Sequence, residues 1–109
     1  MRIWDLPPER LCRQHLLGEH RELHAIWSVL TNGRRGYARH PETLRWQGKL
    51  GALWLRHAAL VDDMQRRGYQ HHSPLDQQLA TGALVQEQVV DSVEAQREQL
   101  RRKGCDCRV

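Results

Sequence analysis

The sequence lacks long hydrophobic runs: no apolar stretch approaches the roughly 18 residues that a membrane-spanning helix needs. Its start lacks a cationic stretch followed by an apolar block, so we expect no signal peptide. Strand-like runs are brief, and there is no internal repeat and no low-complexity segment. We therefore expect no membrane partner and a chain built from helices.

Cysteine is scarce, and its arrangement argues against a metal site. Cys12 lies in a helical pattern, and Cys105 and Cys107 form a Cys-x-Cys pair near the end of the sequence. Without a signal peptide these three thiols should be reduced. A zinc site needs about four ligands, usually from paired clusters, and no second cluster accompanies this pair. The sequence thus predicts a flexible tail, with no metal and no cofactor.

The chain has 109 residues and a formal net charge of +4 at pH 7. This length suits one domain with a modest core, so we expect residues 1–109 to form a single helical domain. The mild positive excess permits a polyanionic partner without requiring one.

Apolar spacing predicts two helices in the first two thirds of the chain. The first runs from about residue 8 to 30, begins with proline in its first turn and stops at Gly33. The second begins at a Pro-Glu pair and covers about 41–67, with Gly68 as its stop.

The last third carries weaker signals. A short helical piece could reach Ala80, and a final helix is expected over about 92–103 with Asp91 as its N-cap. Trp27 and Trp54 are expected in the core. The fold class predicted is all-α, a compact single-domain bundle of about three helices with basic loops.

The most informative stretch is 14–23. His15, Glu19 and Glu22 stand at i, i+4 and i+7, so they share one face of a helix, with Arg21 at its edge. Packing a histidine, two carboxylates and an arginine so tightly is costly unless water or a ligand solvates them. The helix therefore presents either a polar outer surface or a site.

A basic loop is the second candidate. Arg34, Arg35 and Arg39 surround two glycines and Tyr37. Arginines pair with phosphates, glycines let backbone approach them, and an aromatic ring can stack on a base, so the loop favours DNA binding. A solvated charged loop is the alternative. The same two interpretations apply to three residues of the second helix: Arg45, Lys49 and Arg56.

The first two thirds of the chain resemble a known protein family. The segment from Met1 to Tyr69 resembles the pyrimidine dimer DNA glycosylases, the endonuclease V type of ultraviolet-damage repair enzyme. The matching elements, in order, are Arg2-Ile3, Gln14-His15-Leu16, Arg21-Glu22-Leu23, Gly36-Tyr37, His40-Pro41 and Arg66-Arg67-Gly68-Tyr69. Residues 1–70 are therefore expected to be a family-like core, and 71–109 a divergent C-terminal segment.

The resemblance implies a mechanism. Family members flip a nucleotide out of the duplex, and their N-terminal α-amine attacks the sugar C1′; the resulting Schiff base decays by β-elimination. By this likeness Glu22 stabilises the cationic sugar, Arg2 and Arg21 grip phosphates, and Gln14 and His15 face the DNA. The expected partner is double-stranded DNA carrying pyrimidine dimers or abasic sites, bound by a cytoplasmic, nucleoid-associated monomer without a cofactor.

This chain departs from the family pattern in two places. Met1 stands where the best-studied members have a processed threonine, and because Arg2 is bulky we expect Met1 to stay and supply the amine. An α-amine has a pKa of about 7.7–8.0, so a useful fraction is neutral near physiological pH. The aromatic-rich tail of some members is also absent, and Cys105-Asp106-Cys107 stands there instead.

Two alternatives remain open on the sequence. One is a non-catalytic DNA-binding module of the same fold. The other is a metal-binding helical protein, because His20 and His24 stand at i, i+4 as in some helical zinc sites. The ligands of that second alternative would be His15, Glu19, His20 and His24.

Overall fold

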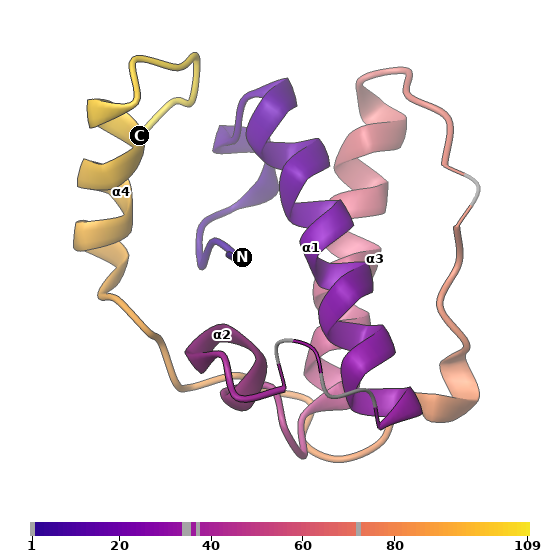
Figure 1. Ribbon diagram of the computed structural model, residues 1–109. Helices are drawn as coiled ribbons and strands as arrows, with labels where there is room; N and C mark the ends of the chain where they lie inside the picture. The colour runs from indigo at the N-terminus through magenta and orange to yellow at the C-terminus, as the bar shows by residue number, and fades with distance from the viewer. Residues whose placement is uncertain (1, 34–35, 37, 72) are drawn as a thin grey trace.

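The computed structural model describes residues 2–33, 36, 38–71 and 73–109, and these residues are helical without a strand (Figure 1). This confirms the predicted all-α class. The elements are the short 3₁₀ helices η1 (Pro8–Arg10) and η2 (Gln77–Leu79) and the α-helices α1 (Arg13–Asn32), α2 (Pro41–Leu44), α3 (Leu50–Arg66) and α4 (Val93–Arg102). No described helix has the length and apolar character to cross a membrane.

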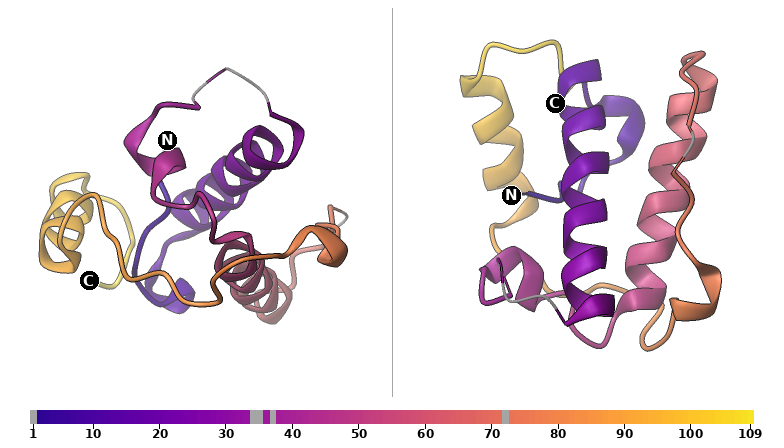
Figure 2. Two further views of the ribbon diagram at one scale, coloured as in Figure 1. Left: turned by 90° about the horizontal axis from the view of Figure 1, so that it is seen from below. Right: turned by 45° about the vertical axis from the view of Figure 1, so that its right-hand side comes forward.

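Helices α1 and α3 lie side by side and form the centre of the fold (Figures 1 and 2). Helix α1 buries Leu16, Leu23 and Ile26, which repeat at helical intervals along one face. Helix α3 also has a buried apolar stripe, which includes Leu53 and Leu60. Burying these stripes against each other is what holds two amphipathic helices together.

The first predicted helix is wrong at its start. Leu11 and Cys12 are extended, so η1 is separate and α1 begins only at Arg13, with Cys12 as its N-cap. The buried Leu11 side chain explains the break, since the chain turns there to place this leucine in the core. The predicted stop is confirmed: Gly33 follows α1 with a φ of 63°.

The second predicted helix is also wrong, because it is two helices. A turn between α2 and α3 places Gly48 at a φ of 72°, which a side chain would resist. Gly82 packs against this turn so closely that a Cβ on it would lie 2.1 Å from the Gly48 carbonyl oxygen. The backbone carbonyls of Thr81 and Ala83 accept hydrogen bonds from Gly51 and Ala52, at the first turn of α3. Residues 81–83 thus satisfy N–H groups that a helix start leaves unpaired.

The last helix forms as predicted, but its cap differs. The N-cap is Ser92, whose side chain accepts the Ala95 N–H. The Asp91 side chain does not cap the helix and can bind another partner. Helix α4 lies across the N-terminal segment from α1 (Figures 1 and 2). Buried Gln96 joins it to that segment, accepting from the Asp5 N–H at 2.8 Å and donating to the Asp5 carboxylate at 2.9 Å.

The predicted flexible tail is wrong. After α4 the chain turns back toward the start of α1, where the Arg108 N–H donates to the Arg10 carbonyl at 2.7 Å. Cys105, Cys107 and Val109 pack against the core. The tail is therefore part of the folded body.

The tryptophan predictions hold in part. Trp27 is buried in the core as expected, whereas Trp54 is only partly buried against it. Trp4 and Trp46 are buried more fully than Trp54.

The buried ion pair between Glu19 on α1 and Arg56 on α3 gives the first prediction. Arg56→Ala should lower the free energy of unfolding by about 3 kcal/mol, because it leaves a buried carboxylate without its cation. Arg66→Ala is the matched control, since Arg66 and Asp62 are 62% and 64% exposed, and it should cost less than about 1 kcal/mol. Denaturant unfolding of both variants measures the difference; equal losses would contradict the prediction.

Candidate active-site cleft

A cleft of about 840 Å³ opens between the first half of α1, the N-terminal segment and the turn after α4. Its size suits a small molecule or an extruded nucleotide. Charged, polar and apolar groups share its lining: Arg2, Trp4, Cys12, Arg13, Gln14, His15, Leu17, Gly18, Glu19, Arg21, Glu22, Gly104, Cys105 and Asp106.

Five of the predicted site residues meet in this cleft. They are Arg2, Gln14, His15, Arg21 and Glu22. Four of them come from the first three turns of α1, as their spacing required, and Arg2 comes from the N-terminal segment. These five residues bring one carboxylate and two guanidinium groups to the cleft.

The basic loop lies elsewhere. Arg39 is exposed and follows the far end of α1, and a helix of 20 residues is about 30 Å long. Arg39 thus does not line the cleft. The other predicted residues, Met1, Arg34, Arg35 and Tyr37, lie outside the described residues.

Glu19 holds the N-terminal segment beside the cleft. Its Oε1 accepts the Trp4 N–H at 2.9 Å, and its two oxygens accept from the Arg56 guanidinium at 2.7 and 3.0 Å. Burial raises the pKa of Glu19, and the charge and hydrogen bonds of Arg56 oppose that rise. The sequence placed Glu19 on a polar face, but it is a structural carboxylate that fixes Trp4.

A second anchor for the same segment is Arg45, whose side chain is buried. It donates to the Ile3 carbonyl at 3.0 Å, to Asp5 at 3.0 Å and to Glu42 at 2.7 Å. The interpretation of Arg45 and Arg56 as DNA-contacting or solvated cations is therefore wrong. Both are used inside the fold, and Lys49 bonds to Gln side chains of residues 86 and 88.

Arg2 has partners from the divergent C-terminal segment. Its Nη2 donates to Asp91 Oδ2 at 2.7 Å and to Gln99 Oε1 at 2.9 Å, and its guanidinium carbon lies 5.0 Å from the Trp4 ring centroid. The hydrogen bonds that Asp91 accepts from Arg2 and from Gln99 lower the pKa of its carboxyl. Arg2 is thus aligned at the cleft before any DNA arrives.

Metal-ligating side chains are grouped differently from the set that the sequence suggested. His15 lies with three cysteines, Glu19 with Arg56, and only His20 and His24 stay together. The proposed set of His15, Glu19, His20 and His24 is therefore wrong as one site. The described residues instead hold two groups of four ligands: Cys12, His15, Cys105 and Cys107, and His20, His24, His57 and His71.

The protonation of these groups follows from burial and from their neighbours. Burial and the adjacent imidazoles lower the pKa of His20 and His57 to about 4, so both are neutral near physiological pH. Burial, with a smaller contribution from the Lys103 charge, lowers the pKa of His15. Burial raises the pKa of the Cys107 thiol to about 12.

Sequence comparison agrees with this geometry. The family model described as pyrimidine dimer DNA glycosylase matches residues 1–77, which is more than half of the chain. The chain belongs to the pyrimidine dimer DNA glycosylase family. Membership of this family identifies the protein as a DNA repair glycosylase in general terms. It also implies that the protein binds damaged DNA. No curated protein and no solved structure matches the chain.

In this glycosylase, the contact between Arg2 and Asp91 predicts a lowered pKa of the Asp91 carboxyl, which can be measured. The Asp91 carboxyl should titrate below an ordinary aspartate, and Arg2→Met should raise its pKa, because the main hydrogen bond to the charged form is lost. A lowered folded-state pKa means that the pair stabilises the fold above the unfolded-state pKa. That contribution is lost as the pH falls through the folded-state pKa.

An NMR pH titration of the Asp91 carboxyl tests this. Arg97→Met is the control, because Arg97 lies on α4 but pairs with Glu94. If Arg2→Met leaves the Asp91 titration unchanged, Arg2 is not held there.

Proposed function

We propose that this chain is a DNA glycosylase with abasic-site lyase activity, acting on pyrimidine dimers or abasic sites in double-stranded DNA. The observation that carries the proposal is the convergence of Glu22, Arg2 and Arg21 on one cleft, beside the segment that leads to the start of the chain. The family membership supports the glycosylase step, and the cleft chemistry supports the lyase step.

The nucleophile in this proposal is the α-amine of Met1, which precedes the anchored residues 2–4. The amine nitrogen forms a bond to C1′ of the extruded nucleotide, and the C1′–N bond to the base breaks with its electron pair leaving on the base. Loss of a proton from the amine and opening of the sugar ring give the Schiff base. Removal of a C2′ proton then expels the 3′ phosphate and nicks the strand.

Glu22 supplies the negative charge that this chemistry needs. Positive charge develops on the sugar as the base leaves, and a carboxylate fixed on α1 can stabilise it without reorganisation. Unlike Glu19, which is fully engaged by Arg56 and Trp4, Glu22 is partly exposed at the cleft. In this proposal the two carboxylates of the helix have separate roles. Glu19 holds the fold together, and Glu22 stabilises the positive charge on the sugar.

Arg2 and Arg21 provide phosphate contacts at the rim. Extruding a nucleotide costs a few kcal/mol, and contacts between arginine and phosphate on both sides of it offset that cost. Gln14, on the first turn of α1, is exposed beside them and can donate to the DNA backbone.

Covalent trapping tests the nucleophile. With borohydride and a duplex carrying an abasic site, the chain should form a stable adduct, and peptide mass spectrometry should locate it on Met1. Acetylating the α-amine should abolish trapping and nicking, because an amide is not nucleophilic. DNA binding without any trapped species would instead identify a non-catalytic module of the same fold.

Glu22→Gln tests the carboxylate. The nicking rate on abasic duplex should fall by on the order of 100-fold, because the stabilising charge is lost while the shape is kept. Glu87→Gln is the matched control, since Glu87 is exposed and lies outside both the cleft and residues 1–77. Similar rates for the two variants would remove Glu22 from the mechanism.

A further inference from the structure

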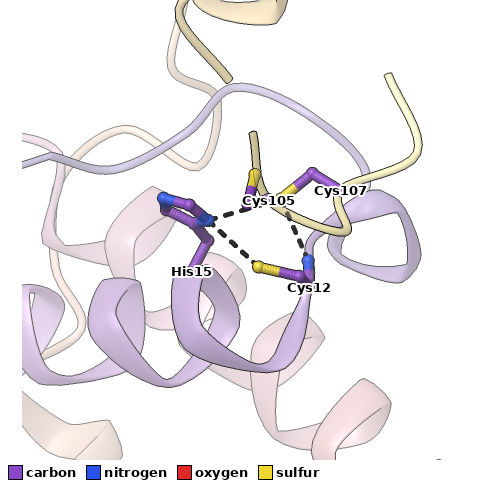
Figure 3. Close-up of side chains that lie close together, drawn as sticks. All are labelled: Cys12, His15, Cys105 and Cys107. Carbon is purple, nitrogen blue, oxygen red and sulfur yellow. Dashed lines mark hydrogen bonds between the residues drawn. The ribbon is translucent and has the colours of Figure 1, made fainter. Parts of the chain in front are cut away.

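Three cysteines and a histidine from opposite ends of the sequence meet at the start of α1 (Figure 3). The Cys12 Sγ lies 3.1 Å from His15 Nδ1, and the Cys107 Sγ lies 3.4 Å from the same nitrogen. Cys105 completes the group, and the four ligand atoms all lie within 4.8 Å of one another. Figure 3 shows the four side chains pointing toward a common centre.

This geometry matches tetrahedral zinc. Bond lengths of about 2.3 Å to sulfur and about 2.0 Å to nitrogen place tetrahedral ligand atoms roughly 3.5–3.8 Å apart. The observed separations need only small adjustments to reach these values. Cys12-x-x-His15 spans one helical turn, and Cys105-x-Cys107 supplies the second pair, so the ligands come in two close pairs as in structural zinc sites.

The backbone around the group also suits thiolate ligands. Cys12 is the N-cap of α1, where the helix dipole favours negative charge. Its own N–H donates to the Cys107 Sγ at 3.0 Å, which is the kind of hydrogen bond that supports a metal-bound sulfur. Lys103 lies close enough to act on His15 electrostatically, and its charge offsets the excess negative charge of three thiolates.

We propose that Cys12, His15, Cys105 and Cys107 bind one structural zinc ion. Each cysteine thiol releases its proton to solvent as the ion binds, and no redox change is involved. Four protein ligands close the coordination sphere, so the ion stabilises rather than reacts. Three of these residues also line the cleft, so zinc would fix the wall that faces Glu22, and His15 would support that wall instead of contacting DNA.

A second group of ligands carries an independent inference. His20 and His24 on α1, His57 on α3 and His71 after α3 turn their Nε2 atoms toward one another. The Nε2 distances are 3.2 Å from His24 to His20, 3.2 Å from His57 to His24 and 2.8 Å from His71 to His20. Tetrahedral zinc with four imidazole ligands places nitrogens about 3.3 Å apart.

The four nitrogens converge, all within 4.8 Å of one another, whereas hydrogen bonding between neutral imidazoles needs only two separate donor–acceptor pairs. A cation at the centre satisfies all four at once. We infer that His20, His24, His57 and His71 bind a second zinc ion, which ties α1, α3 and the segment after α3 together.

Metal analysis of untagged protein, purified without chelators from zinc-supplemented cells, tests both sites. Two zinc ions per chain are expected. Cys107→Ser and His57→Gln should each leave one zinc ion, and the double variant should leave none. His40→Gln is the control, because His40 caps α2 outside both groups and should keep two.

Each single variant also controls for the other. Misfolding would release both ions together, whereas a specific ligand loss releases one. Wild-type protein with no stoichiometric zinc, nickel, copper, cobalt or iron would overturn both proposals, and loss of both ions from each single variant would overturn the assignment to separate sites. Retention of two ions by Cys107→Ser or by His57→Gln would overturn the site concerned.

Cobalt substitution separates the sites by spectrum. Cobalt-loaded wild-type protein should show a sulfur-to-cobalt charge-transfer band that His57→Gln keeps and Cys107→Ser loses. Thiol titration of the zinc-loaded protein should find all three cysteines protected, and a chelator should expose them. Protection that only a reductant removes would show a disulfide and contradict the first site. Neither proposal depends on the lyase activity, since every readout is metal content, spectrum or thiol reactivity.

Discussion

The structure depends on one buried carboxylate. Glu19 is almost inaccessible to solvent, yet it joins three segments: it lies on α1, pairs with Arg56 of α3 and accepts the backbone N–H of Trp4. A charge placed there is costly unless it is paired and hydrogen-bonded, and Arg56 and Trp4 together supply a cation and three hydrogen bonds. Because Trp4 is fixed by a backbone hydrogen bond, the position of residues 2–4 follows from the packing of α1 against α3.

That constraint also positions the wall of the cleft. The same helix carries the buried Glu19 and, three residues later, the partly exposed Glu22, so the anchor and the cleft share one rigid element. Arg45 fixes Ile3 and Asp5 from the opposite side, and Gln96 fixes Asp5 from α4. A segment without secondary structure is thereby held from three sides, and the proposed site at this end of the chain requires such positioning.

Local sequence patterns predicted the helix faces and a helix end. They could not predict the contacts between residues that are far apart in the sequence. Helical spacing placed His15, Glu19 and Glu22 on one face and placed Gly33 at a helix end, because these depend on neighbouring residues alone. It could not show that Glu19 is buried, since that depends on Arg56, 37 residues away. The Cys12–His15 pair had the spacing of a ligand pair, but its partners lie more than 90 residues away, and only the fold brings them together.

The C-terminal third shows that the cleft is built from two parts of the chain, one inside the family match and one beyond it. The family match ends at residue 77, yet Gly104, Cys105 and Asp106 form one wall of the cleft, and Asp91 and Gln99 align Arg2. Residues within the family match thus supply Glu22, Arg2 and Arg21 to the cleft, while a segment beyond the match forms one wall and holds Arg2. In the proposed mechanism, lesion choice depends on both parts, because an extruded nucleotide must fit the wall as well as reach Glu22.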